Sequence, residues 1–165
     1  MGCRGFSENS PVAIESRRAL RLIYFSPTGT TRTVLEAIAE GFVTQRIEHY
    51  DLTRATQRSA HFREGVAIIG IPVYAGRVPE VCLARLAGFT AAGVPAVLVA
   101  LYGNREYEDA LLELRDVATQ AGFSAVAAGA FIGEHSYSTA AQPIAAGRPD
   151  AADLDYLFWV GCAGS

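Results

Sequence analysis

The chain has 165 residues, a formal net charge of −3, a hydrophobic fraction of 50% and a mean hydropathy of +0.19. This length suits one domain with one well-filled core, and no stretch approaches the roughly 20 uncharged apolar residues of a membrane-spanning helix. The longest basic feature is Arg17-Arg18, which argues against a nucleic-acid partner. Composition therefore predicts a soluble protein that binds neither nucleic acid nor membrane.

The three cysteines, Cys3, Cys82 and Cys162, lie far apart and form no Cys-x-x-Cys pair. Their number and spacing argue against a disulfide framework and a metal cluster, and they favour a reducing cytoplasm. Residues 1–18 lack the apolar core of a secretory signal. We expect them to form a flexible N-terminal tail, followed by one domain over residues 19–165.

Short apolar runs alternate with segments of helical period, which is typical of βαβ units and a mostly parallel sheet. Helical spacing follows the first run, from Val34 to Phe42, and recurs around Cys82 and from Ala110 to Val117. The pattern predicts an α/β fold with a doubly wound, five-stranded parallel sheet in a three-layer α/β/α arrangement. The five predicted strands cover residues 20–25, 47–52, 66–71, 96–101 and 124–131.

These strands differ in their expected burial. Residues 47–52 alternate in polarity and predict an exposed strand, whereas 66–71 is an unbroken apolar run that predicts the centre of the sheet. Residues 96–101 and 124–131 are expected to resemble that central run. Ligands of open parallel sheets bind outside the carboxyl ends of the strands, so the loops after the first, third and fourth strands are the candidate site.

The first of these loops is rich in hydroxyl residues and contains no carboxylate. A phosphate there would meet free amide hydrogens and the positive end of the helix dipole, and Gly29 would permit a tight backbone turn. Neither Gly-x-x-x-x-Gly-Lys-Ser/Thr nor Gly-x-Gly-x-x-Gly is present. An isolated Thr-Gly-Thr could equally be a simple helix cap. The predicted phosphate-binding residues are Ser26, Thr28, Gly29, Thr30 and Thr31.

Ser-Pro-Thr-Gly-Thr-Thr after Ile23-Tyr24-Phe25 resembles the flavodoxin fingerprint Thr/Ser-x-Thr-Gly-x-Thr. It is most similar to the flavodoxin domain of flavodoxin and iron–sulfur fusion proteins, although their cysteine-rich cluster domain is missing. The resemblance covers roughly residues 20–155. It implies a flavodoxin-like fold of strand order 2-1-3-4-5 and non-covalent binding of FMN.

The same resemblance extends to two further loops. The segment after the third strand resembles a flavin-ring loop, with Tyr74 as a ring contact, and contributes Pro72, Val73, Tyr74, Ala75 and Gly76. The segment after the fourth strand resembles Gly-Asp-x-x-Tyr and contributes Tyr102, Gly103, Asn104 and Tyr107. On this alignment Tyr107 stacks on the flavin ring, as aromatic side chains favour, and Asn104 replaces an aspartate. Each tyrosine taken alone could instead be a packing residue.

Charge near the ring would control the flavin potential. Asn104 removes one negative charge, and Arg77 and Arg105 would add positive potential unless they are solvated loop charges. Together these residues predict easier formation of the anionic reduced flavin.

The sequence therefore predicts an FMN-binding electron carrier without catalytic or metal-binding residues of its own. Its expected partner is a redox protein, with an iron–sulfur protein as one candidate. An NAD(P)H-dependent quinone or flavin reductase on the same fold and a flavin-free binding module remain alternatives.

Overall fold

The computed structural model describes residues 19–42, 46–54, 59–103, 106–134 and 138–164, with side chains described up to residue 157. The predicted tail, residues 1–18, lies outside these ranges. So do Asn104 and Arg105, two residues expected near the ring.

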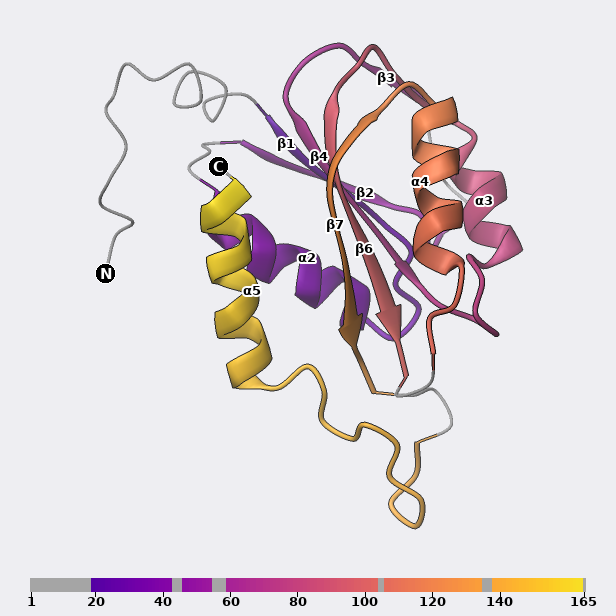
Figure 1. The fold of residues 1–165 in the computed structure, drawn as a ribbon, viewed down its shortest axis with the longest axis vertical. Coiled ribbons are helices and arrows are strands. Elements are labelled where there is room, and N and C mark those ends of the chain that lie inside the picture. The colour runs from indigo at the N-terminus through magenta and orange to yellow at the C-terminus, as the bar shows by residue number, and fades with distance from the viewer. Residues whose placement is uncertain (1–18, 43–45, 55–58, 104–105, 135–137, 165) are drawn as a thin grey trace.

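A five-stranded parallel sheet forms the centre of the molecule (Figure 1). Its strands lie in the order β2-β1-β4-β6-β7, and β3 and β5 belong to a separate small sheet. When only the five strands of the large sheet are numbered along the chain, their order is 2-1-3-4-5, as predicted. The strands are β1 (Leu20–Tyr24), β2 (Ile47–Asp51), β4 (Val66–Pro72), β6 (Pro95–Tyr102) and β7 (Ser124–Ile132).

Strand position explains most of the burial. Central β4 is buried from Ala67 to Ile71, because sheet neighbours and helices surround it. Edge strand β2 alternates between exposed and half-buried residues, as expected. The expectation that residues 124–131 resemble the central run is wrong. Residues 124–128 of β7 are all exposed, because β7 lies at the edge of the sheet and pairs only with β6 along the described chain.

Two pairs of helices cover the sheet (Figure 1). Helices α2 (Thr30–Glu40) and α5 (Ala151–Gly164) pack together over a core that contains Leu35 and Leu157. Helices α3 (Glu80–Leu86) and α4 (Ala110–Gln120) bury the opposite core. Helix α2 approaches β4 closely at Gly70, where a Cβ atom would lie 2.4 Å from Cδ1 of Leu35.

A two-stranded parallel sheet, β3 (Ala60–Phe62) with β5 (Phe89–Ala91), was not predicted. Each strand has only three residues, too few to show a period of two. The rings of Phe62 and Phe89 stack at 6.0 Å between centroids, and Tyr50 meets both edge-on. Aromatic packing therefore accompanies this small sheet.

Cys82 lies fully inside the α3–α4 core, and burial raises the pKa of its thiol to about 12. The thiol is thus a small apolar core group. Among the residues that the structure describes, no helix is long and apolar enough to cross a membrane. Those residues also contain no cluster of three His, Cys, Asp or Glu side chains that could hold a metal ion.

Candidate functional site

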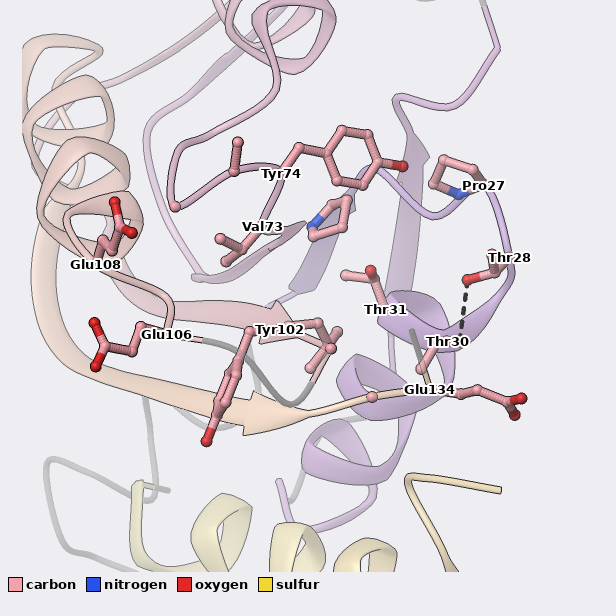
Figure 2. Close-up of a pocket in the computed structure, with 16 residues that line it drawn as sticks. Pro27, Thr28, Thr30, Thr31, Val73, Tyr74, Tyr102, Glu106, Glu108 and Glu134 are labelled. Atoms are coloured by element: carbon pink, nitrogen blue, oxygen red, sulfur yellow. Dashed lines mark hydrogen bonds between the residues drawn. The ribbon is translucent and has the colours of Figure 1, made fainter. Parts of the chain in front are cut away.

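A cavity of about 820 Å³ opens at the carboxyl ends of β1, β4, β6 and β7 (Figure 2). Its size is in the range of small-molecule and cofactor sites. It lies where the strand order reverses, as expected for an open parallel sheet. Ten predicted site residues line it: Thr28, Thr30, Thr31, Pro72, Val73, Tyr74, Ala75, Gly76, Tyr102 and Gly103.

The loop after β1 presents unused donors to this cavity. Gly29 has a φ of 86°, in the left-handed region, and α2 begins at the next residue. The amide N–H groups of Thr28, Thr30 and Thr31 have no hydrogen-bond partner within the described chain. Such groups at a helix N-terminus carry partial positive charge and attract anions.

Thr31 provides an independent sign of a ligand. Only 3% of the residue is exposed, yet its hydroxyl has no partner among the described residues. Its methyl group faces β4, where a Cβ atom on Gly70 would lie 3.0 Å from Cγ2. A buried hydroxyl without a partner costs roughly 1–3 kcal/mol, so a water molecule or a ligand in the cavity is expected to bond this group.

Ser26 and Gly29 shape the loop without lining the cavity. The Ser26 Oγ atom accepts a 3.1 Å hydrogen bond from the amide of Arg32, in the first turn of α2. Nearer the cavity, the hydroxyls of Thr28 and Thr30 lie 3.1 Å apart (Figure 2). Of the five predicted phosphate-binding residues, Ser26 and Gly29 therefore shape the loop. Thr28, Thr30 and Thr31 line the cavity.

The second loop folds as a tight turn. Tyr74 and Arg77 exchange two backbone hydrogen bonds of 3.0 Å, with Ala75 and Gly76 between them at φ values of 50° and 76°. Positive φ at both central residues is the geometry of a two-residue hairpin turn. Tyr74 is 48% exposed on this turn, and partial burial raises the pKa of its hydroxyl.

Glu113 of α4 holds this turn in place. Its carboxylate accepts hydrogen bonds from the Arg77 guanidinium at 3.0 and 3.1 Å and from the Val78 amide at 2.9 Å. These contacts, that of Arg77 first, hold the pKa of the Glu113 carboxyl below its usual range. The charge of Arg77 is therefore offset by Glu113, and the positive potential expected from Arg77 is not directed at the cavity.

The loop after β6 differs from its sequence-based prediction. Tyr102 and Gly103 line the cavity, but Tyr107 does not. The Tyr107 ring packs against Tyr102, with 5.4 Å between centroids, and borders a shallower groove between α4 and β7. Tyr107 therefore lies outside the cavity lining, and its stacking on a flavin stays a prediction. Asn104 lies outside the described residues.

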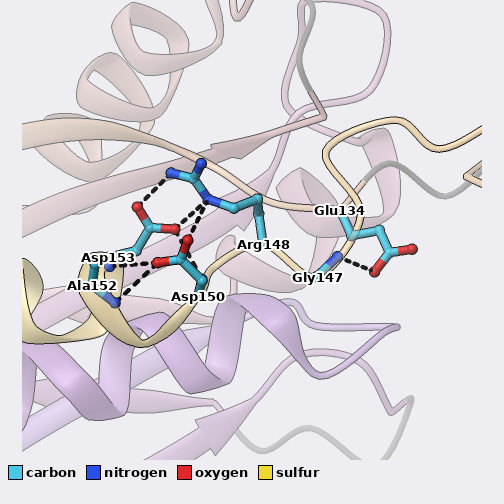
Figure 3. Close-up of polar contacts among 6 residues, drawn as sticks. All are labelled: Glu134, Gly147, Arg148, Asp150, Ala152 and Asp153. Atoms are coloured by element: carbon cyan, nitrogen blue, oxygen red, sulfur yellow. Dashed lines mark hydrogen bonds and ion pairs between the residues drawn. The ribbon is translucent and has the colours of Figure 1, made fainter.

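The connection from β7 to α5 completes the cavity with Gly133 and Glu134. Glu134 anchors a later part of the connection, since its Oε2 accepts a 3.0 Å hydrogen bond from the Gly147 amide (Figure 3). Arg148 forms an ion pair with Asp153 in the first turn of α5, and the pKa of Asp153 is lowered by it. The carboxylate of Asp150 caps the same helix end.

Six further residues that the sequence did not predict line the cavity: Pro27, Leu101, Glu106, Glu108, Gly133 and Glu134. Three of them are glutamates, and the acidic run that follows the fourth strand was a visible signal. Glu106 and Glu108 add negative charge where the loop after β6 borders the cavity, whereas Glu134 lies beside Thr30 of the phosphate loop (Figure 2). The expectation of an anionic reduced flavin stays a prediction, because Asn104 and Arg105 lie outside the described residues.

No protein-family model and no curated protein matches the sequence. Solved structures do match its fold. Oxidised flavodoxin 1 from Bacillus cereus superposes with a TM-score of 0.60 at 14% identity, covering 87% of this chain and 95% of that protein.

The fold is that of the flavodoxins. A flavodoxin, WrbA-like protein from Agrobacterium tumefaciens shares this flavodoxin-like fold, with a TM-score of 0.54 at 14% identity over 88% of this chain and 93% of its own. The Flv1 flavodiiron core from Synechocystis contains it as one part: the match covers 89% of this chain but 35% of that protein, with a TM-score of 0.56 at 17% identity.

Proposed function

We propose that this protein binds FMN non-covalently and carries electrons between redox partners. The proposal depends chiefly on the buried Thr31 hydroxyl, which has no hydrogen-bond partner along the described chain. It lies at the start of α2, beside the amides of Thr28 and Thr30, which also lack partners there. A phosphate group would satisfy these donors together. The flavodoxin-like fold and the flavodoxins among its structural neighbours support a flavin at this place.

The residues present suit FMN in both of its parts. Thr28, Thr30 and Thr31 would hold the phosphate, while the turn at Tyr74 and the backbone at Gly103 border the space for the ring. FMN would supply the electron-transfer chemistry, and the protein would supply binding, orientation and electrostatics. Glu106 and Glu108 would disfavour added negative charge on the ring, which makes a low reduction potential the expected property.

The partner proposed for such a carrier is another redox protein. The resemblance of the phosphate loop to the flavodoxin domain of flavodoxin and iron–sulfur fusion proteins favours an iron–sulfur partner.

Cofactor identification tests the proposal. Purified protein should be yellow and should release FMN on denaturation, and the apo-protein should bind FMN more tightly than riboflavin. Release of FAD, or equal affinity for FMN and riboflavin, would contradict a phosphate site at α2. Absence of any flavin binding would favour the flavin-free module.

A second measurement separates carrier from reductase. NADPH or NADH is added under anaerobic conditions, and flavin absorbance is followed. A carrier should keep its oxidised spectrum until a redox partner is supplied. Rapid bleaching by the nicotinamide alone would instead identify a reductase.

A further inference from the structure

The amide of Ser26 has an unusual partner, the side chain of Thr53. Ser26 N–H donates a 2.8 Å hydrogen bond to Thr53 Oγ1, across from the end of β2. The two preceding ladder bonds are ordinary backbone contacts, from Phe25 N to Gly70 O at 3.1 Å and from Leu52 N to Tyr24 O at 2.7 Å. The Thr53 hydroxyl thus extends the hydrogen bonding of the sheet one step into the phosphate loop.

Thr53 is itself held from two sides. Its amide donates a 2.8 Å hydrogen bond to the carboxylate of Asp51. Its carbonyl accepts a 2.8 Å bond from Nη1 of Arg85, which also bonds the carbonyl of Leu52. The Arg85 guanidinium lies 5.9 Å from the ring centroid of Phe25, so the same cation contacts both strands' ends.

Ser26 in turn organises the loop beyond it. Its carbonyl accepts the Gly29 amide at 3.2 Å, and its hydroxyl accepts the Arg32 amide at 3.1 Å. Fixing the Ser26 peptide therefore fixes both ends of the turn that carries the free amides of Thr28, Thr30 and Thr31. Neither Thr53 nor Arg85 lines the cavity.

We propose that Thr53, held by Arg85, is a positioning residue that pre-organises the phosphate loop and sets the preference for phosphorylated over unphosphorylated flavin. This inference rests on the proposed function. Without the Thr53 hydroxyl, the Ser26 amide loses its acceptor and the loop samples several conformations. Phosphate binding must then order the loop, which weakens affinity, whereas the ring contacts stay as they were.

The test compares the dissociation constants of apo-protein for FMN and for riboflavin. Thr53→Val should reduce FMN affinity roughly two- to tenfold, the value of one neutral hydrogen bond, and leave riboflavin affinity unchanged. Thr53→Ser should restore the wild-type ratio, because it retains the acceptor oxygen. Arg85→Met provides a second variant. It should reduce the preference for FMN over riboflavin by less than Thr53→Val does, because Arg85 acts on the loop through Thr53.

Thr119→Val is the matched control. Its hydroxyl donates a 2.8 Å hydrogen bond to the Arg115 carbonyl on α4, away from the phosphate loop, so the affinity ratio should stay at the wild-type value. An unchanged ratio in both Thr53→Val and Arg85→Met would overturn the inference, as would equal losses for both ligands. A wild-type protein without preference for FMN would instead refute the proposed function itself.

Discussion

The carboxylate of Glu108 lies against Gly76: a Cβ atom on Gly76 would fall 2.2 Å from Glu108 Oε2. Gly76 is also held at a φ of 76°, where an L-residue is strained by roughly 1–2 kcal/mol. Glycine at this position therefore avoids backbone strain and leaves room for the Glu108 side chain, whose carboxylate would have to shift to admit a Cβ atom.

Gly76→Ala should destabilise the apo-protein by at least this backbone strain and shift the urea midpoint downward. The double variant Gly76→Ala/Glu108→Ala should recover only the part of the lost stability that comes from the clash between the new Cβ atom and the Glu108 carboxylate. Complete recovery would show that the backbone strain is negligible.

The carboxylates of Glu106 and Glu108 should hold down the reduction potential of bound FMN. Glu106→Gln and Glu108→Gln should each raise it, on the order of 10–20 mV, because a negative charge near the reduced ring is removed. Glu64→Gln, at the turn before β4, serves as control. Redox titration at low and high salt measures the effect, which should shrink with screening. A lower reduction potential in the variants would contradict the proposal that Glu106 and Glu108 hold the FMN potential down.

Thr31→Val separates ligand binding from folding. Valine has nearly the shape of threonine but no hydroxyl, so the apo-protein should become as stable or more stable once the unpartnered group is gone. FMN binding should weaken by about tenfold or more, since a hydrogen bond to a charged phosphate is worth roughly 1.5–3 kcal/mol. Calorimetry and fluorescence titration report the two quantities. A destabilised apo-protein with unchanged FMN affinity would assign the hydroxyl a structural role.

Tyr74 should contribute more to ring binding than Tyr107, contrary to the sequence-based expectation. Tyr74→Ala should weaken FMN roughly two- to tenfold and let flavin fluorescence recover, because a stacked aromatic contact is lost. Tyr107→Ala should change neither, since Tyr107 lies outside the cavity lining. A larger effect of Tyr107→Ala than of Tyr74→Ala would show that Tyr107 contacts the flavin ring and that its loop moves on binding.

Glu113 should make stability depend on pH in the acidic range. Its folded pKa lies below the ordinary value of 4.5, so its stabilising contribution is complete above that pH and is lost as pH falls through the folded pKa. The stability difference between wild type and Glu113→Gln should therefore shrink as pH falls from 7 to 3. Urea unfolding at several pH values measures it, with Asp116→Asn as control. A difference that is constant with pH would exclude the ion pair as its source.

The sequence by itself determined the strands of the parallel sheet and predicted the phosphate loop, because both depend on local patterns. The strand order was implied by the resemblance to flavodoxins. Buried strands appear as apolar runs, and a hydroxyl-rich loop before a helix presents its donors wherever the rest of the chain lies. The same resemblance predicted that the loops at Tyr74 and Gly103 contact a flavin, and both residues line the cavity.

Only the tertiary structure decided which residues face one another. The exposure of β7 depends on its place at the sheet edge, and the roles of Glu134 and Thr53 depend on contacts between segments distant in sequence. The charge of Arg77 was ambiguous until Glu113 of α4 was found beside it. Spacing along a chain carries no information about such neighbours, because side-chain pairs across loops are set by the packing of the elements that bear them.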